Sequence, residues 1–216
     1  MLLCLITIVF GGHAWAKSPT RVIDGDTIAL NGIVYRLHGI DAPEAGQKCR
    51  KPDGKSSWDC GKAAISALEG LVLGQTVDCD DRGQDGYGRT IAVCKVAGKD
   101  INAMMVASGY AWAFRKYSND YVDLEDRAHQ NNIGVWITDK VTAPWDYRAE
   151  LWKLGQQEAP DGCPIKGNIS ENGLIYHTPW SPWYKKTKID VKQGERWFCD
   201  EAQALKAGWR APYWGR

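Results

Sequence analysis

The chain has 216 residues, of which 44% are hydrophobic and 25% are charged. This composition is that of a globular protein with one well-buried domain and a small additional module, and it excludes wholesale disorder. Lysines and arginines number 27 against 26 aspartates and glutamates, which gives a formal net charge of +1. Because the chain has no overall basic field, binding of nucleic acid would depend on local clusters of basic side chains and on metal ions.

The first 16 residues have the pattern of a signal peptide. Residues 2–10 are apolar and uncharged, and Ala14-Trp15-Ala16 has the small-x-small form of a signal-peptidase site. The apolar run is too short to span a bilayer, although no Lys or Arg precedes it. We therefore expect cleavage after Ala16 and a mature protein that is secreted or periplasmic.

Six cysteines follow this segment: Cys49, Cys60, Cys79, Cys94, Cys163 and Cys199. An even number of cysteines in an exported chain indicates disulfides. The sequence alone leaves the pairing open, although local spacing favours 49 with 60, 79 with 94 and 163 with 199. A zinc site is the alternative, but no C-x-x-C pair occurs and the histidines are scattered.

Short β-branched runs separated by turn residues begin at Thr20. Strands are expected at 21–23, 27–30 and 33–37, and the turns between them predict an antiparallel meander. Two further strands are expected at 75–80 and 87–96, on either side of a polar turn.

Three helices are expected among these strands. Residues 60–73 place apolar side chains on one helical face and end at Gly74, and helices are also expected at 101–108 and 121–132. Strands with helices interspersed and then closing the unit predict a small β-barrel with packed helices.

The second part of the chain reads as a separate module. Residues 156–162 are polar and lack an apolar period, so we expect a linker between a domain at 17–155 and a module at 163–216. The module is rich in tryptophan and small, so a bridge from Cys163 to Cys199 would help it to fold alone.

Three short clusters carry candidate chemistry: residues 24–27 (DGDT), 36–44 (RLHGIDAPE) and 85–89 (DGYGR). Each alone has a structural explanation as a turn, a strand exit or a surface ion pair. Together they supply carboxylates to hold one hard cation, a carboxylate to orient water, and two guanidinium groups for phosphoryl oxygens. That set is what phosphodiester hydrolysis requires.

In this order, and with a helix between the second and third, the clusters resemble the motifs of the staphylococcal nuclease (thermonuclease) family over roughly residues 20–140. The resemblance implies a fold of the α+β or mainly β class, a five-stranded oligonucleotide-binding (OB) barrel with three helices. It implies a phosphodiesterase that uses Ca²⁺, cleaves DNA and RNA, preferably single-stranded, and leaves 3′-phosphate ends. We expect a monomer that does not span the membrane.

The resemblance also assigns roles to individual residues. Asp26 and Asp41 would bind the metal together with the main-chain carbonyl of Ala42, while Asp24 lies beside the site. Glu44 would orient or deprotonate the attacking water, and the phosphate would be bound by Arg36 and Arg89.

Two tyrosines are expected in the nucleotide pocket. Tyr87 precedes Arg89 in the third cluster, and Tyr117 follows a run of aromatic and basic residues. Stacking on a base or bonding a terminal phosphate is one role for them, and core packing is the alternative.

The C-terminal segment resembles the small module called "sunset" through residues 163–170 (CPIKGNIS) and 194–199 (GERWFC). Its lysines and neighbouring aromatic side chains are compatible with binding of nucleic acid or of an envelope or wall polymer, and a solvated surface is the default interpretation. Two alternatives to a nuclease are therefore kept: a catalytically silent OB domain that only binds nucleic acid, and an envelope-binding protein acting through this module.

Overall fold

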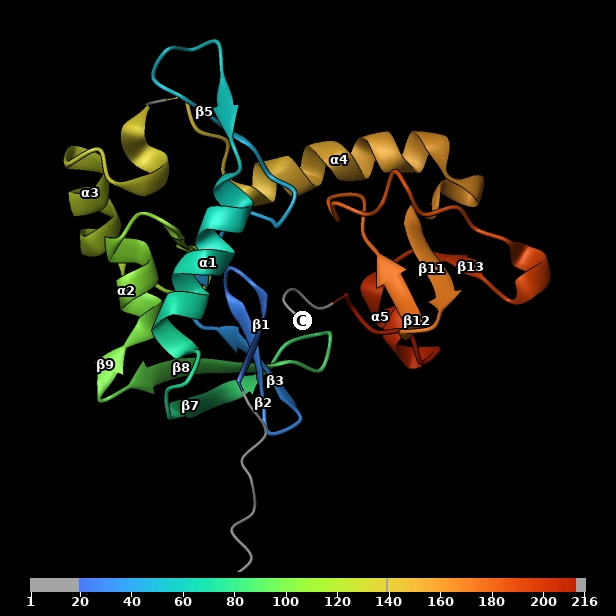
Figure 1. Cartoon of the computed structure of the whole chain (residues 1–216), viewed down its shortest axis with the longest axis horizontal. Helices are drawn as coiled ribbons and strands as arrows, with labels where there is room; N and C mark the ends of the chain where they lie inside the picture. Colours follow the sequence, from blue (N-terminus) through green and yellow to red (C-terminus); the bar gives the residue numbers. More distant parts are fainter. Residues whose placement is uncertain (1–19, 139, 213–216) are drawn as a thin grey trace, which may run out of the picture.

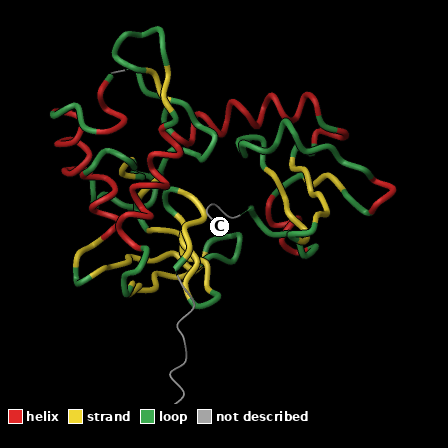
Figure 2. Tube along the Cα trace, in the orientation of Figure 1, coloured by secondary structure: helices red, strands yellow, loops and turns green. Residues whose placement is uncertain are grey.

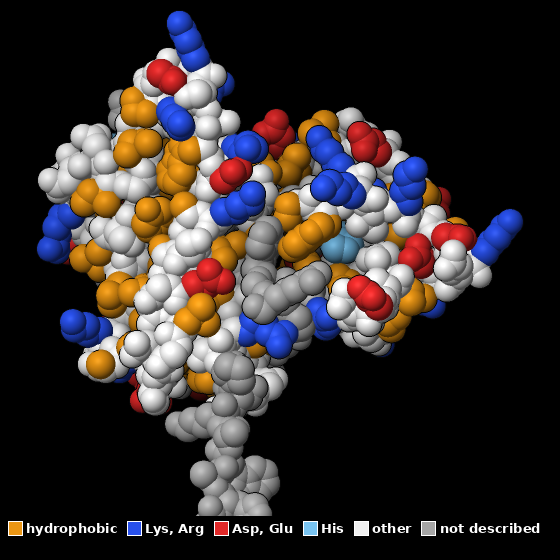
Figure 3. Space-filling model, in the orientation of Figure 1, with side chains coloured by type: hydrophobic (Ala, Val, Ile, Leu, Met, Phe, Trp, Pro, Cys, Tyr) orange, Lys and Arg blue, Asp and Glu red, His pale blue; other side chains and the backbone are white. Residues whose placement is uncertain are grey.

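The computed structural model describes residues 20–138 and 140–212. The predicted signal peptide lies outside the described residues. Figure 1 shows a barrel body and a smaller C-terminal module, with one long helix, α4 (Pro144–Glu158), running from the first to the second. The space-filling view in Figure 3 shows blue and red side chains scattered over one face, in keeping with the near-zero net charge.

The main sheet of the body has the strand order β1-β2-β3-β8-β7, with β9 paired to β8. The first three strands form the predicted antiparallel meander, and β3 then pairs in parallel with β8. Asn31 and Gly32 both have positive φ, as a tight hairpin turn requires. The strands are β1 (Arg21–Asp24), β2 (Thr27–Leu30), β3 (Ile33–Leu37), β7 (Val77–Gln84), β8 (Thr90–Val96) and β9 (Lys99–Asp100).

The hairpin of β7 and β8 differs from the prediction, which placed its turn at 81–86. Strand β7 continues to Gln84 through a bulge, because the register shifts between Asp81 and Gln84. Gly83 has a φ of 107°, a conformation that only glycine adopts easily, and this permits the bulge. The turn therefore lies at Asp85 to Arg89, where the amide of Asp85 donates to the Arg89 carbonyl at 3.0 Å.

Three helices pack on the body close to where they were predicted: α1 (Cys60–Val72), α2 (Ile101–Ala107) and α3 (Val122–Gln130). Helix α1 buries Ala64, Leu68 and Val72 in the main core, as the apolar spacing indicated. Short elements complete the body: β4 (Ile40–Asp41), β5 (Cys49–Arg50), β6 (Ser57–Trp58), β10 (Trp112–Ala113) and the 3₁₀ helix η1 (Gly134–Ile137).

The cysteines form the three pairs that spacing favoured. Cys49 bonds Cys60, Cys79 bonds Cys94 across β7 and β8, and the module is closed by a bond between Cys163 and Cys199. With these six sulfurs in disulfides, they are not free as zinc ligands.

The segment expected as an irregular linker is instead largely helical. Helix α4 includes residues 156–158, and residues 160–162 form the 3₁₀ helix η2 (Pro160–Gly162). The helix escaped prediction because it lies between the two bodies with little apolar periodicity, whereas Gln and Glu are good helix formers. At Gly155, which is buried, a Cβ atom would press on the side chains of Pro164 and Pro179. The division of the chain into domains stays a prediction.

The module contains a three-stranded sheet in the order β12-β11-β13, followed by a short helix (Figure 2). Its buried core consists of Ile165, Tyr176, Phe198, Ala204 and Trp209. The elements are β11 (Ile165–Ser170), β12 (Gly173–His177), the 3₁₀ helix η3 (Val191–Gln193), β13 (Arg196–Phe198) and α5 (Glu201–Lys206). No helix in the described parts of the chain is long and apolar enough to cross a bilayer.

Candidate active site

Asp26 joins the first two sequence clusters. It lies in the tight turn between β1 and β2, and the residue is 7% exposed. One carboxylate oxygen accepts a hydrogen bond from the amide of Ala42 at 2.9 Å, and the other accepts from the hydroxyl of Thr27 at 3.0 Å. These bonds hold Asp26 against the strand that carries Asp41.

Arg36 connects the two carboxylates predicted to bind metal. From β3, its guanidinium pairs with Asp26 at 2.8 Å and with Asp41 at 2.9 Å. It also donates to the carbonyl of Ile40 at 3.1 Å, which fixes the orientation of the fork. Asp41 is fully buried, so its charge depends on these partners.

Glu44 belongs to the same cluster through a residue that the sequence did not single out, Arg148 of α4. The Arg148 guanidinium donates to Glu44 at 2.6 Å and to both oxygens of Asp41 at 3.1 and 2.8 Å. No local sequence signal indicates Arg148, because it lies more than 100 residues from both partners and on a helix with a weak apolar pattern.

Glu44 and Asp24 have raised pKa values. Burial raises the pKa of Glu44 to about 7, the charges of Asp41 and Asp26 add to this, and Arg148 opposes it. Burial also raises the pKa of Asp24 well above its ordinary value, with further contributions from the charges of Glu44 and Asp26. Asp24 therefore lies beside the cluster, as expected.

Arg89 and Tyr87 lie on the turn between β7 and β8. Asp85 orients Arg89 by accepting from its Nε at 2.7 Å. Against the effect of burial, the charges of Asp85, Glu201 and Asp26 all raise the pKa of Arg89. Tyr87 is 43% exposed, and its ring centre lies 5.4 Å from the Arg89 guanidinium.

Tyr117 lies apart from these groups. It is 65% exposed and contacts Phe114, at 5.0 Å between ring centres, and the Lys116 ammonium. Phe114 in turn stacks on Trp145 of α4 and lines a groove of about 500 Å³ with Trp112 and Trp136. The structure thus places the two predicted pocket tyrosines in different surroundings.

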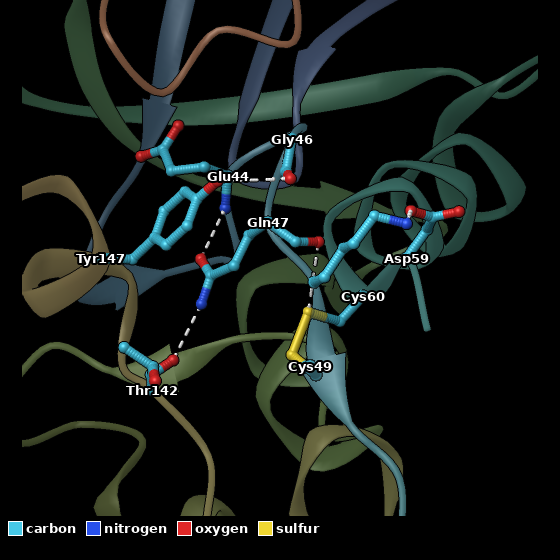
Figure 4. Close-up of a disulfide and its surroundings, with 9 residues drawn as sticks. Glu44, Gly46, Gln47, Cys49, Asp59, Cys60, Thr142 and Tyr147 are labelled. Atoms are coloured by element: carbon cyan, nitrogen blue, oxygen red, sulfur yellow. Dashed lines mark hydrogen bonds and ion pairs between the residues drawn. A yellow bond between two sulfur atoms is a disulfide. The ribbon is translucent and has the colours of Figure 1, made fainter. Parts of the chain in front are cut away.

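The loop after Glu44 is held by a buried glutamine (Figure 4). The Gln47 side chain accepts from the amide of Glu44 at 3.1 Å and donates to the Thr142 carbonyl at 2.8 Å. The Gln47 carbonyl accepts from the amide of Gly61, beside the Cys49–Cys60 disulfide. Gly61 packs so tightly that a Cβ atom there would overlap the carbonyl oxygen of Glu44.

Comparison with known proteins identifies the family of this chain. The family model described as "Staphylococcal nuclease homologue" matches residues 34–138. An uncharacterized endonuclease of Haemophilus influenzae is 32% identical over 158 residues, which cover 68% of this chain and 83% of that protein. The chain belongs to the staphylococcal nuclease family.

Other relatives of this staphylococcal nuclease homologue carry different names. Micrococcal nuclease of Shigella flexneri is 30% identical over 163 residues, covering 66% of this chain and 87% of that protein. The succinoglycan biosynthesis protein ExoI of Rhizobium meliloti is 37% identical over 140 residues, covering 61% of this chain and 72% of that protein.

Family membership also identifies the fold. The sheet β1-β2-β3-β8-β7 with its three helices is the OB-fold domain expected from the sequence. A second family model, described as ArfC, matches residues 153–211. The likeness of this segment to the sunset module stays a prediction.

The predicted metal site has few side-chain ligands. Within residues 20–138 and 140–212, no group of three or more His, Cys, Asp and Glu is placed to hold a metal ion. The predicted set has only two such side chains, Asp26 and Asp41, with a backbone carbonyl as the third donor. Both carboxylates form ion pairs with the Arg36 guanidinium, so their oxygens already surround a positive charge. Carboxylate and carbonyl oxygens are also the ligands that Ca²⁺ prefers, so this set of donors fits Ca²⁺.

Proposed function

We propose that this chain is an exported, Ca²⁺-dependent nuclease that hydrolyses phosphodiester bonds of DNA and RNA and leaves 3′-phosphate ends. One observation carries the proposal: Asp26, Asp41 and Glu44 lie in one cluster with the guanidinium groups of Arg36 and Arg148. A domain that only bound nucleic acid would not need these buried carboxylates, which repel a polyanion and cost free energy to bury.

Asp26, Asp41 and the carbonyl of Ala42 would hold the cation. A bound Ca²⁺ would draw charge from the phosphate and make the phosphorus more open to attack. The hydrogen bond from the Ala42 amide to Asp26 keeps the carbonyl and the two carboxylates in a fixed relation. Little rearrangement of the backbone would then accompany binding.

Glu44 is suited to take a proton from the attacking water. Its pKa of about 7 lies near neutral pH, where a general base works well. Arg36 and Arg89 would bind the phosphate oxygens through their planar forks. An arginine gives up its proton poorly because its pKa is above about 12, so water is the better proton donor to the leaving oxygen.

The wider features of the proposal also have support. The three disulfides suit an oxidising compartment, as expected for a secreted or periplasmic protein. Tyr87 is exposed beside Arg89 and can stack on a base that is not held in a duplex, which favours single-stranded substrate.

The test uses residues 17–216 on heat-denatured DNA, with Ca²⁺ or with a chelator. We expect the chelator to abolish cleavage and Glu44→Gln to slow it about 100-fold or more, because a general base of this kind contributes that much. Glu150→Gln, on the exposed face of α4, is the matched control and should cut like the wild type. Cleavage that survives chelation, or Glu44→Gln cutting at the wild-type rate, would contradict the proposal.

A further inference from the structure

Arg148 occupies the centre of the active site although it lies outside both segments matched by family models, residues 34–138 and 153–211. Its two terminal nitrogens meet the two oxygens of Asp41, and one of them also meets Glu44. This paired arrangement is the one by which arginine binds two oxygens of a carboxylate or a phosphate. The Arg148 side chain is 25% exposed, whereas that of Asp41 is wholly buried, so Arg148 is the member of this pair that borders solvent.

The position of Arg148 is fixed by the helix that carries it. The adjacent Tyr147 donates from its hydroxyl to the Gly46 carbonyl at 3.3 Å, and Gln47 ties the catalytic loop to Thr142 just before α4 (Figure 4). One turn earlier, Trp145 stacks on Phe114 with rings 5.4 Å apart and an angle of 7° between their planes. The start of α4 is thus attached to the barrel at three points.

Charge indicates what Arg148 does there. With Glu44 ionised, three carboxylates face the guanidinium groups of Arg36 and Arg148, so the cluster carries one net negative charge. Without Arg148 the cluster would carry two negative charges and attract a divalent cation more strongly. With Arg148 and a divalent cation both present, the cluster is net positive and attracts a phosphate.

We propose that Arg148 is a third substrate-binding arginine of the nuclease site, which competes with Ca²⁺ for Asp41 and binds a phosphate oxygen once the cation is in place. The proposal rests on the proposed function and deepens it. It makes metal and phosphate binding mutually dependent: Arg148 weakens binding of Ca²⁺ alone and strengthens binding of phosphate to the Ca²⁺-loaded protein.

The test measures binding by calorimetry in Arg148→Met, which keeps side-chain length but removes the charge. We expect the variant to bind Ca²⁺ alone about tenfold more tightly than the wild type. In saturating Ca²⁺ it should bind a nucleoside monophosphate about tenfold to a hundredfold more weakly, because a charged hydrogen bond is lost. These opposite changes would not follow from a purely structural role.

Two further variants sharpen this test. Arg127→Met removes an arginine from the exposed face of α3 and should leave both affinities unchanged. Arg148→Lys keeps the charge without the fork, so it should bind Ca²⁺ like the wild type and phosphate with intermediate affinity. If Arg148→Met does not fold, the weaker phosphate binding expected of Arg148→Lys tests the proposal in its place.

The outcomes separate this proposal from the proposed function. If the wild type cuts DNA but Arg148→Met lacks the opposite changes in affinity, or Arg148→Lys binds phosphate as tightly as the wild type, the role of Arg148 is overturned and the nuclease stands. If the changes appear but the wild type cuts no nucleic acid, the nuclease proposal fails and the binding role stands. Absence of Ca²⁺ binding by the wild type overturns both.

Discussion

The barrel body and the C-terminal module are stabilised in different ways. The core of the body is continuous from Val22 on β1 through Leu68 of α1 to Met105 of α2. The module has a small core around Trp209 and is closed by one disulfide that spans 36 residues of sequence. Small units bury too little apolar surface to offset their conformational entropy, so the cross-link is needed in the module more than in the body.

Removing the module disulfide should cause the largest difference in stability between the module and the barrel body. For a loop of this length, Cys163→Ser with Cys199→Ser is expected to destabilise the module by about 3–4 kcal/mol, enough to unfold it. Limited proteolysis and amide hydrogen exchange should then find the module open and the barrel protected. Cys79→Ser with Cys94→Ser is the counterpart in the body, which should stay folded because its core is larger. If the module and the body unfolded to the same extent when their own disulfides were removed, the module would not depend on its cross-link more than the body does.

Within the body, Gly61 of α1 packs tightly against the loop that carries Glu44. Gly61→Ala would push the Glu44 carbonyl, so we expect cleavage to fall about tenfold to a hundredfold with little change in the module. Gly70→Ala, on the same helix, has open space for its Cβ atom and is the matched control. Both variants should be compared for cleavage rate and for melting temperature. Similar rates in the two would show that the loop tolerates the displacement.

A smaller effect should appear in the pH dependence of the module. Burial lowers the pKa of His177 from its ordinary value of 6.5 to about 4, and the charge of Lys166 adds to this. Between pH 4 and 6.5 the histidine is protonated in the unfolded chain but neutral in the folded module. The free energy of unfolding of the module is therefore highest above pH 6.5 and decreases as the pH falls towards 4.

At about 1.4 kcal/mol for each pH unit between these two values, this contribution should amount to at most about 3 kcal/mol. His177→Gln can keep hydrogen bonds to Asn168 and Ser181 without taking up a proton, so its unfolding should depend less on pH between 4 and 6.5. Melting curves of both proteins over this range measure the difference. Parallel curves would show that His177 does not titrate in this way.

Much of the barrel could be predicted from local sequence signals. The Asn31-Gly32 turn and the apolar face of α1 depend on neighbours a few residues apart, and both were predicted correctly. The bulge near Gly83 was missed, because a shift in register depends on the partner strand and not on the strand's own sequence. Helix α4 was missed because packing at its two ends, rather than an apolar stripe, holds it.

The same division applies to the candidate site. Asp26, Arg36, Asp41 and Glu44 lie on short motifs within the first three strands and the segment after them, and the structure brings them together. Arg148 lies on a helix that is distant in sequence and has no local motif. Its contact with Asp41 is therefore seen only in the three-dimensional structure. The roles of these residues stay predictions until the variants are measured.

The length of helix α4 sets both the distance between the two regions and the angle by which one is rotated relative to the other about the helix axis. Each residue of an α-helix turns the chain by about 100° and advances it by about 1.5 Å. Arg148 faces the carboxylate cluster near its start, and Gly155, seven positions on, meets the prolines of the module. Inserting a single residue between them would swing the module around the helix axis. Natural variation in this segment should therefore keep its length, even where the exposed side chains change freely.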